Sequence, residues 1–139
     1  MQYWLMKSEP ETYSWNDLCR EGVGTWDGVR NYQARNNLRA MKKGDRCFFY
    51  HSISGKEIVG ICQVVEEHSP DETAEDGDWS VVKVSALEVF ETPVTLAKIK
   101  ADPQLSEMAL IRQGRLSVCP VTPKEFTHLR KLGKSRAIG

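Results

Sequence analysis

Residues 46–65 constrain the fold of this chain most, because they form two β-rich segments separated by a turn sequence. Residues 46–51 and 57–65 are rich in aromatic and β-branched side chains, and the Ser-Gly-Lys sequence at 54–56 is typical of a hairpin turn. Gly60 indicates a β-bulge or a close approach to the backbone. Since two strands alone are barely stable, we expect this hairpin to lie within a larger sheet.

The other segments predict short helices and strands around the hairpin. Residues 82–86 alternate apolar and polar side chains, as a half-buried strand does, and Pro93 is expected to end that strand. The further predictions are a strand at residues 3–6, helices from Ser14 to Glu21 and from Tyr32 or Gln33 to Met41, short helices at residues 95–100 and 105–111, a strand at residues 116–118, and a final helix from Thr122 to Leu132. This pattern predicts one α+β domain over residues 1–139, with a strongly curved mixed or antiparallel sheet.

Composition fits a globular domain with one core: 139 residues, of which 40% are hydrophobic and 27% charged. No apolar run approaches the roughly 18 residues of a membrane span, and the first residues lack a signal-peptide pattern, so we expect a cytoplasmic protein. We expect neither metal nor cofactor, because the cysteines are far apart and form no C-x-x-C pair; they are Cys19, Cys47, Cys62 and Cys119. Reduced core thiols are the simplest interpretation.

The formal net charge is zero, but the charges are segregated along the chain. Residues 66–78 hold seven acids and no Lys or Arg, which predicts an exposed, mobile acidic loop. Residues 28–46 are the opposite, since Asp45 is their only acid. Their basic residues are Arg30, Arg35, Arg39, Lys42, Lys43 and Arg46. This stretch is therefore a candidate phosphate-binding surface, although Arg39, Lys42 and Lys43 alone could equally form a solvated helix face.

The run at residues 26–36 suggests what such a surface would bind. It combines Trp26 and Tyr32 with amides, a glycine and two arginines, where a core segment would carry aliphatic residues. Aromatic faces stack on bases, amides reach their hydrogen-bonding edges, and guanidinium groups meet phosphate. The alternative is that the tryptophan anchors the core and the rest opens an amphipathic helix.

Five segments of the chain resemble the EVE domain family: residues 3–10, 26–36, 49–52, 59–61 and 112–118. The resemblance implies a PUA-like fold, which is a small curved β-barrel flanked by short helices and related to the YTH domains that read methylated adenine in RNA. It also implies a nucleic-acid-binding module that holds a modified, flipped-out base in an aromatic cage with a basic rim. Stacking returns about 1–3 kcal/mol per base, against a few kcal/mol for flipping, so such a cage suits a loosened base.

By matching positions, the resemblance implies that Trp26 is a cage wall and that Asn31 and the turn of Lys7, Ser8 and Glu9 read the base edge. The other ligand-binding candidates are Asp27, Tyr32, Arg112 and Gln113, and the phosphate-binding candidates are Arg30, Arg35 and Arg115, with Arg112 serving either role.

Each of these residues also has a structural interpretation. Asp27 and Asn31 could cap turns, and Lys7 could pair with Glu9. Arg112 and Arg115 could anchor the acidic loop, and Gln113 could be an ordinary loop residue. We expect the remaining aromatic candidates to lie in the core more often than in a cage: Tyr32, Tyr50, Trp15 and Trp4.

The chain departs from the family at residues 69–73, which read Ser-Pro-Asp-Glu-Thr where many relatives carry Tyr-Pro-Asp-Pro-Thr. An aromatic residue and a proline are missing, which leaves the second cage wall open, with Trp79 as the candidate substitute. The chain also lacks the long basic N-terminal extension of the nuclear relatives, which favours a stand-alone bacterial module.

Two other classes of function compete with that of a modified-base reader. An enzyme acting on nucleotides or RNA could use His51 as acid or base, but no catalytic motif accompanies it, and a lone His at a strand end is more often structural. A protein-interaction adaptor could use Leu96, Ile99 and Leu105, although their spacing fits a core-facing helix better. DNA or RNA, a free nucleobase or nucleoside, and the oligomeric state stay open.

Overall fold

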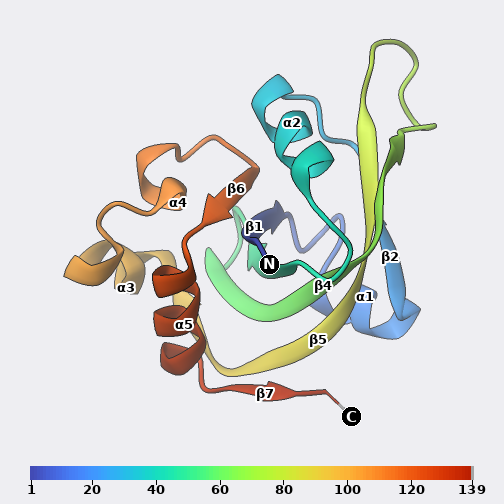
Figure 1. Cartoon of the computed structure of the whole chain (residues 1–139). Coiled ribbons are helices and arrows are strands. Elements are labelled where there is room, and N and C mark those ends of the chain that lie inside the picture. Colours follow the sequence, from blue (N-terminus) through green and yellow to red (C-terminus); the bar gives the residue numbers. More distant parts are fainter. Residues whose placement is uncertain (139) are drawn as a thin grey trace.

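The computed structural model describes residues 1–138, so the predicted domain end at residue 139 lies outside the described residues. Within residues 1–138 the chain forms a seven-stranded mixed sheet with five short α-helices (Figure 1). The strands are β1 (Tyr3–Ser8), β2 (Val23–Trp26), β3 (Arg46–His51), β4 (Glu57–Pro70), β5 (Ser80–Thr95), β6 (Val118–Val121) and β7 (Ser135–Ala137). The helices are α1 (Trp15–Glu21), α2 (Tyr32–Ala40), α3 (Leu96–Ala101), α4 (Ala109–Arg112) and α5 (Pro123–Leu132), with a 3-10 turn at Pro103–Leu105.

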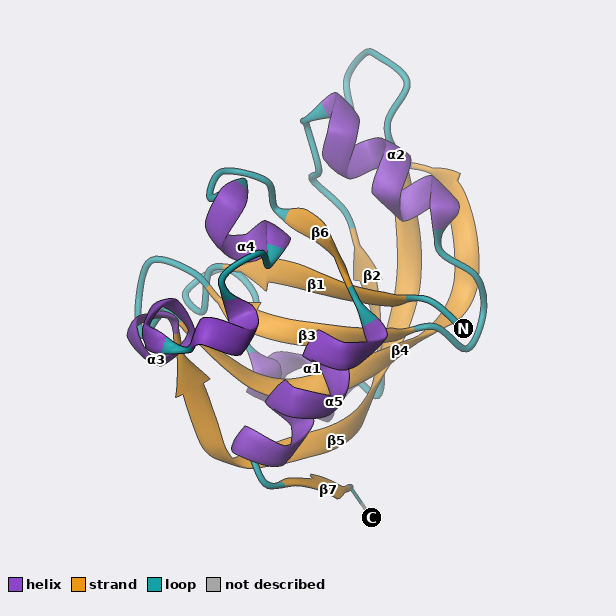
Figure 2. Cartoon of the chain, turned by 60° about the vertical axis from the view of Figure 1, so that its left-hand side comes forward, coloured by secondary structure: helices purple, strands orange, loops and turns teal. Residues whose placement is uncertain are grey.

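The sheet is curved, as predicted, but it does not close into the barrel that the resemblance implied. Its strand order is β2-β5-β4-β3-β1-β6, with β7 paired to β5, and only β1 and β3 run parallel. Helix α2 packs beside the terminal strand β6, where the Asn37 side-chain amide donates to the Val118 carbonyl oxygen at 2.7 Å. This helix thereby satisfies one backbone acceptor of the edge strand. Helices α3, α4 and α5 lie together on another side of the sheet (Figure 2), and α4 also packs against β6.

The predicted hairpin is confirmed, and β4 and β5 extend further than the sequence indicated. Strand β4 continues past residue 65 to Pro70, and β5 continues past Pro93 to Thr95. Pro93 is tolerated because it falls within a register shift, between the Gly60–Val89 and Ile58–Val94 pairs, where it needs no ladder hydrogen bond.

Gly60 lies where the backbone is approached closely, as predicted. A Cβ atom there would lie 2.5 Å from the Trp15 ring, so only glycine fits without a rearrangement. The nearby register shifts bend β4 and β5 around the core (Figure 1).

Helix ends follow the sequence signals closely. Ser14 with Asp17 and Thr122 with Glu125 form the capping boxes that begin α1 and α5. The sequence did not predict β2 and β7, because these strands are only four and three residues long and carry little pattern. The predicted helix at residues 105–111 is split into the 3-10 turn and α4, and the predicted strand at 116–118 is β6, displaced to residues 118–121.

The core is centred on β3 and has a buried acid, Asp45, beside it. Phe48 and Phe49 are fully buried, and Asp45, 3% exposed, accepts hydrogen bonds from the Trp4 indole at 3.1 Å and the Lys42 backbone at 3.0 Å. Three of the four cysteines are buried and all four are free thiols. Within the described residues no helix is long and apolar enough to span a membrane, and no group of three metal-ligating side chains occurs.

Candidate nucleic-acid interface

A cavity of about 590 Å³ lies beside Trp26, at the ends of β1 and β2. We call it the Trp26 cavity; it is lined by Lys7, Ser8, Glu9, Thr12, Tyr13, Glu21, Val23, Thr25, Trp26 and Asp27. Five residues predicted from the sequence therefore converge here: Lys7, Ser8, Glu9, Trp26 and Asp27. Its size is typical of a small-molecule site, which a single base would fit.

Trp26 belongs to the cavity wall and to the core at once. It is 6% exposed, and its ring meets Phe49 edge to face with 5.4 Å between centroids and Tyr13 with 6.2 Å. The two interpretations of this residue are thus compatible, since most of the indole is buried while part of it lines the cavity.

Acidic groups dominate the polar lining of the Trp26 cavity. Glu9, Glu21 and Asp27 are carboxylates, and Lys7 is the single cation among the lining residues. The Tyr13 hydroxyl donates to Glu21 Oε1 at 2.5 Å, and burial together with this hydrogen bond raises the pKa of Tyr13. Such a lining favours ligands that donate hydrogen bonds and disfavours phosphate.

Lys7 and Ser8 are already engaged by the fold. Lys7 Nζ donates to the Gly114 carbonyl oxygen at 2.7 Å instead of pairing with Glu9, and burial lowers the pKa of Lys7. The Ser8 hydroxyl donates to the Tyr13 carbonyl oxygen at 2.6 Å. These bonds fix the β1 end against the loop before β6 and against the residues that precede α1.

Asn31, Gln113 and Arg115 come together in a second, shallower cavity of about 380 Å³, with Gln33 and Gly114. Asn31 caps α2 by accepting from the Ala34 backbone at 2.9 Å, which is the structural role considered for it. The Gln33 and Gln113 amides bond to each other at 2.8 Å. The structure thus places these residues beside the Trp26 cavity but not in its lining.

The predicted acidic loop is shorter than expected and is anchored by ion pairs of Asp71 and Asp78. We use the name acidic loop below for residues 71–79, since residues 66–70 belong to β4. The Asp71 carboxylate is fully buried and accepts from Gly28 N at 3.0 Å, Arg30 Nη1 at 2.9 Å and the Thr73 hydroxyl at 2.6 Å. Burial alone would raise the pKa of Asp71, but these hydrogen bonds lower it well below its usual range. An Asp followed two residues later by Thr is the turn signal that could have revealed this anchor.

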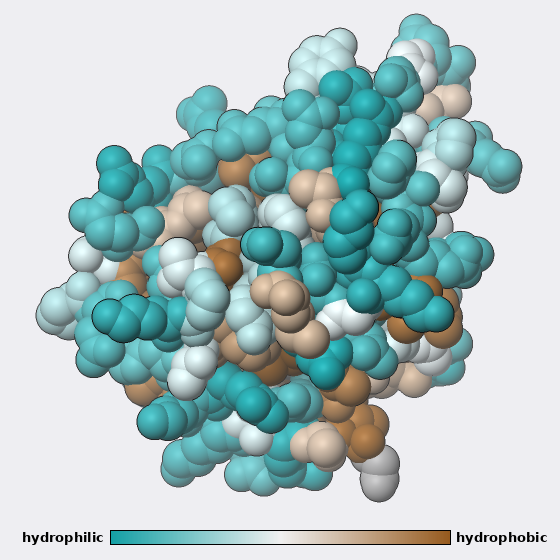
Figure 3. All heavy atoms as spheres, in the orientation of Figure 1, coloured by the Kyte–Doolittle hydropathy of each residue, from teal (hydrophilic) through white to brown (hydrophobic). Residues whose placement is uncertain are grey.

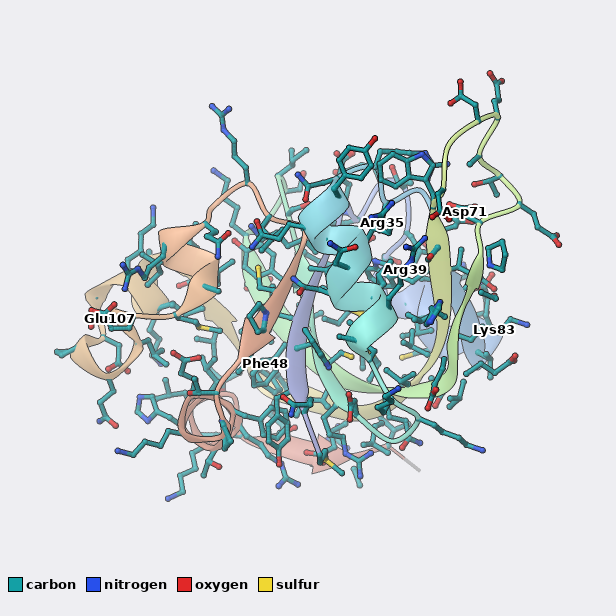
Figure 4. All side chains as sticks on the ribbon, turned by 45° about the horizontal axis from the view of Figure 1, so that its top comes forward. Arg35, Arg39, Phe48, Asp71, Lys83 and Glu107 are labelled. Carbon is teal, nitrogen blue, oxygen red and sulfur yellow. The ribbon has the colours of Figure 1, made fainter. Side chains whose placement is uncertain are left out.

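The arginines of α2 face the same loop (Figure 4). Arg39 pairs with the Asp78 carboxylate at 2.7 Å, and Arg35 donates to the Asp78 carbonyl oxygen at 3.0 Å. Two cations of the most basic stretch, Arg30 and Arg39, are therefore compensated by the acidic loop. Hydrophilic side chains dominate this part of the surface (Figure 3).

Tyr32 lies on the surface, contrary to the expectation that it is core. Its side chain is 66% exposed and stacks on Trp79 with 5.1 Å between ring centroids, while the Arg35 guanidinium lies 5.0 Å from the Tyr32 centroid. Trp79 is absent from the residues that line the Trp26 cavity. It stacks on Tyr32 instead of supplying a second wall there.

Arg112 and Arg115 do not anchor the acidic loop, so that alternative was wrong. Arg112 pairs with Glu107 near α4, and Arg115 is exposed and has no ion pair among residues 1–138. The anchoring cations are Arg30 and Arg39.

The residues that an enzyme or a protein-interaction adaptor would use have structural roles. His51 Nε2 accepts from the Trp15 backbone N–H at 3.1 Å at the start of α1, and burial lowers the pKa of His51. That acceptor is the atom a general base would need. Ile99 and Leu105 are fully buried, as expected for a core-facing helix, and Leu96 is half-buried.

Comparison with known proteins agrees with the resemblance seen in the sequence. Mouse thymocyte nuclear protein 1 is 38% identical over 164 residues, covering 94% of this chain and 73% of that protein. A protein from Agrobacterium tumefaciens is 46% identical, with a TM-score of 0.93 over 96% of this chain and 93% of that one. An ASCH protein from Zymomonas mobilis, at 11% identity and a TM-score of 0.58, shares the fold alone.

One solved relative carries a ligand. The human THYN1 protein, in complex with DNA containing 5-methylcytosine, is 35% identical, with a TM-score of 0.90 over 98% of this chain and 99% of that one. The model of the EVE domain matches residues 2–132. The chain therefore belongs to the EVE domain family.

Proposed function

We propose that this protein is a reader of modified DNA that holds a flipped, 5-substituted cytosine in the Trp26 cavity. The observation that carries the proposal is the cavity itself, which combines an aromatic wall with three carboxylates. The complex of the human relative with DNA containing 5-methylcytosine supports DNA and this base. RNA is the alternative that the same experiment tests.

The chemistry of the lining suits cytosine. Its exocyclic amino group donates hydrogen bonds, and Asp or Glu side chains are the usual acceptors for it. Glu9 and Asp27 are exposed carboxylates in the lining, while Trp26 and Val23 offer apolar contact to a methyl group. One methyl group provides about 1–3 kcal/mol of discrimination, so we expect a preference and not absolute selectivity.

The phosphates must lie outside the acidic lining. Arg115 is exposed and lines the neighbouring cavity, and Arg112 is close to it in the chain. Arg35 donates only to neutral oxygens and keeps its charge available, whereas Arg30 is held by Asp71. We therefore propose Arg115, Arg112 and Arg35 as phosphate contacts, and Arg30 chiefly as a support of the cavity wall.

The test compares binding of duplex and single-stranded DNA and RNA with cytosine or 5-methylcytosine at one position. Asp27→Asn and Glu9→Gln each remove one exposed lining carboxylate, and Glu75→Gln, in the acidic loop, is the matched control. We expect the wild type and the control to prefer methylated DNA, and the two cavity variants to lose most of that preference.

Trp26→Ala is a poor probe, because truncating a buried tryptophan costs about 3–5 kcal/mol of stability. Equal affinity of the wild type for methylated and unmethylated DNA would contradict the proposal, and a preference confined to RNA would reassign the polymer. Cleavage of any oligonucleotide would move the protein to the enzyme class.

A further inference from the structure

Another hollow, of about 310 Å³, adjoins the Trp26 cavity and contains Lys56 and Lys100, which the sequence did not single out. We call it the lysine groove. It is lined by Lys7, Tyr50, Ser52, Ile53, Lys56, Leu96, Lys100, Leu110, Ile111 and Gly114. Lys7 lines both hollows, so the groove begins where the Trp26 cavity ends.

The topology of the sheet brings these lysines together from distant parts of the chain. The Leu96 backbone N–H donates to the Lys56 carbonyl oxygen at 2.8 Å, which ties the turn before β4 to the start of α3. Lys100 lies in the last turn of that short helix. Lys7 pairs in register with Tyr50 and reaches Gly114 through its side chain. The convergence is therefore a property of the fold and not of one flexible segment.

The charge of the groove is the opposite of the charge of the cavity. None of Lys7, Lys56 and Lys100 has a carboxylate within 4.0 Å among residues 1–138, and no Asp or Glu lines the groove. Across Lys7, the lining of the Trp26 cavity carries three carboxylates. Two adjoining hollows of opposite charge match a nucleotide, whose base donates hydrogen bonds and whose backbone is anionic.

The floor of the groove is apolar, which suits a sugar lying between phosphates. Leu96, Leu110 and Ile111 contribute this floor. At the lip, Ile53 is 66% exposed and has a φ of 67°, an unfavourable conformation for a β-branched residue. Strained, exposed residues of this kind gather at ligand-binding sites.

We infer that the lysine groove binds the sugar–phosphate backbone next to the flipped nucleotide, on the strand that carries the modified base. Lys56 and Lys100 contact the phosphates, and Lys7 lies between the base and its backbone. This inference rests on the proposed function, because it assumes that the base occupies the Trp26 cavity.

The test measures the salt dependence of binding to a duplex with one 5-methylcytosine. Lys100→Gln and Lys56→Asn each remove one groove charge, and asparagine tolerates the positive φ of 45° at position 56. Lys98→Gln is the matched control, since Lys98 lies on the same helix α3 but does not line the groove. Thermal unfolding of each exposed-lysine variant confirms that the fold is kept.

We expect each groove variant to lower the slope of log K against log salt by about one and the affinity at low salt by roughly threefold to tenfold, with the preference for methylated DNA kept. Slopes and affinities equal to those of Lys98→Gln, with wild-type binding intact, would overturn the groove assignment alone. Absence of DNA binding by the wild type would overturn the proposed function and the groove together.

Discussion

The basic surface around α2, formed by Arg30, Arg35 and Arg39, and the lysine groove each hold three cations. They differ in whether carboxylates lie next to these cations. Around α2, Arg30 and Arg39 pair with Asp71 and Asp78 of the acidic loop. In the groove, Lys56 and Lys100 have no carboxylate partner among residues 1–138. Two arginines near α2 are thus neutralised, whereas Lys56 and Lys100, which the fold brings together, remain available.

The difference teaches that clustering of charge along a chain is a poor guide to surface potential. An arginine that is paired and packed supports a loop, and it contributes to phosphate binding only if the pair opens. Arg30 and Arg39 fix the acidic loop, and Asp71 of that loop also holds Gly28 in the turn next to the cavity. Among the groove lysines, Lys7 is bound to the Gly114 carbonyl oxygen, whereas Lys56 and Lys100 have no comparable structural task.

Asp71→Asn should produce the largest effect, on the α2 side of the comparison. Asparagine keeps the shape but loses the charge and one acceptor, so bonds from Gly28 and Arg30 weaken. We expect the free energy of unfolding in urea to fall by about 2 kcal/mol. Glu72→Gln, an exposed neighbour, should stay close to wild type. Equal stability of the two variants would show that the acidic loop is not anchored as described.

Asp78→Asn should have a smaller effect, on binding instead of stability. It removes the carboxylate that neutralises Arg39, so the α2 surface gains an available cation. We expect affinity for unmethylated duplex DNA at low salt to rise by about threefold and the salt slope to steepen by about one. Unchanged affinity and salt slope would mean that the α2 surface lies away from the DNA. The α2 surface and the lysine groove would then differ only in their contribution to stability.

The smallest expected effect is on the pH dependence of stability, which differs between the acidic loop and the lysine groove. Hydrogen bonds hold the pKa of Asp71 so low that its contribution is lost only in strong acid. His51, between the groove residues Tyr50 and Ser52, has its pKa lowered from 6.5, mainly by burial. Its stabilising contribution is therefore present above pH 6.5 and is lost as the pH falls toward the lowered value.

Between about pH 7.5 and 5.5 the free energy of unfolding in urea should therefore fall, and by less than in Asp71→Asn. His51→Gln, which keeps an acceptor for the Trp15 N–H, should remove that part of the pH dependence. An identical pH dependence in the variant and the wild type would exclude His51 as its source.

Local signals made much of the fold predictable. Capping boxes at Ser14 and Thr122 placed α1 and α5, and the turn at residues 54–56 placed the central hairpin. Pro93 was expected to end its strand, but β5 continues past it. A register shift falls at Pro93, so the sheet needs no hydrogen bond from the backbone nitrogen there. The open sheet was not predicted; at its β6 edge Asn37 donates to the Val118 carbonyl oxygen, which is a tertiary contact without a local sequence signal.

The candidate site was predictable only in part. Residues 7–9 and 26–27 were found because they lie in two compact motifs, and both motifs line the Trp26 cavity. Tyr13 and Glu21 were missed, because the packing of α1 against β2 brings them there. Lys56 and Lys100 could not be identified, since they are ordinary surface lysines in the sequence and meet only through the pairing of β4 with β5.

The most direct test of the central claim is the fluorescence of 2-aminopurine placed next to a single 5-methylcytosine in duplex DNA. Flipping removes a stacking neighbour, so we predict that wild-type protein raises the fluorescence at saturation, that the unmethylated duplex responds less, and that Asp27→Asn weakens the response. Saturable binding to the methylated duplex with unchanged fluorescence would contradict the claim that the base leaves the helix and enters the Trp26 cavity.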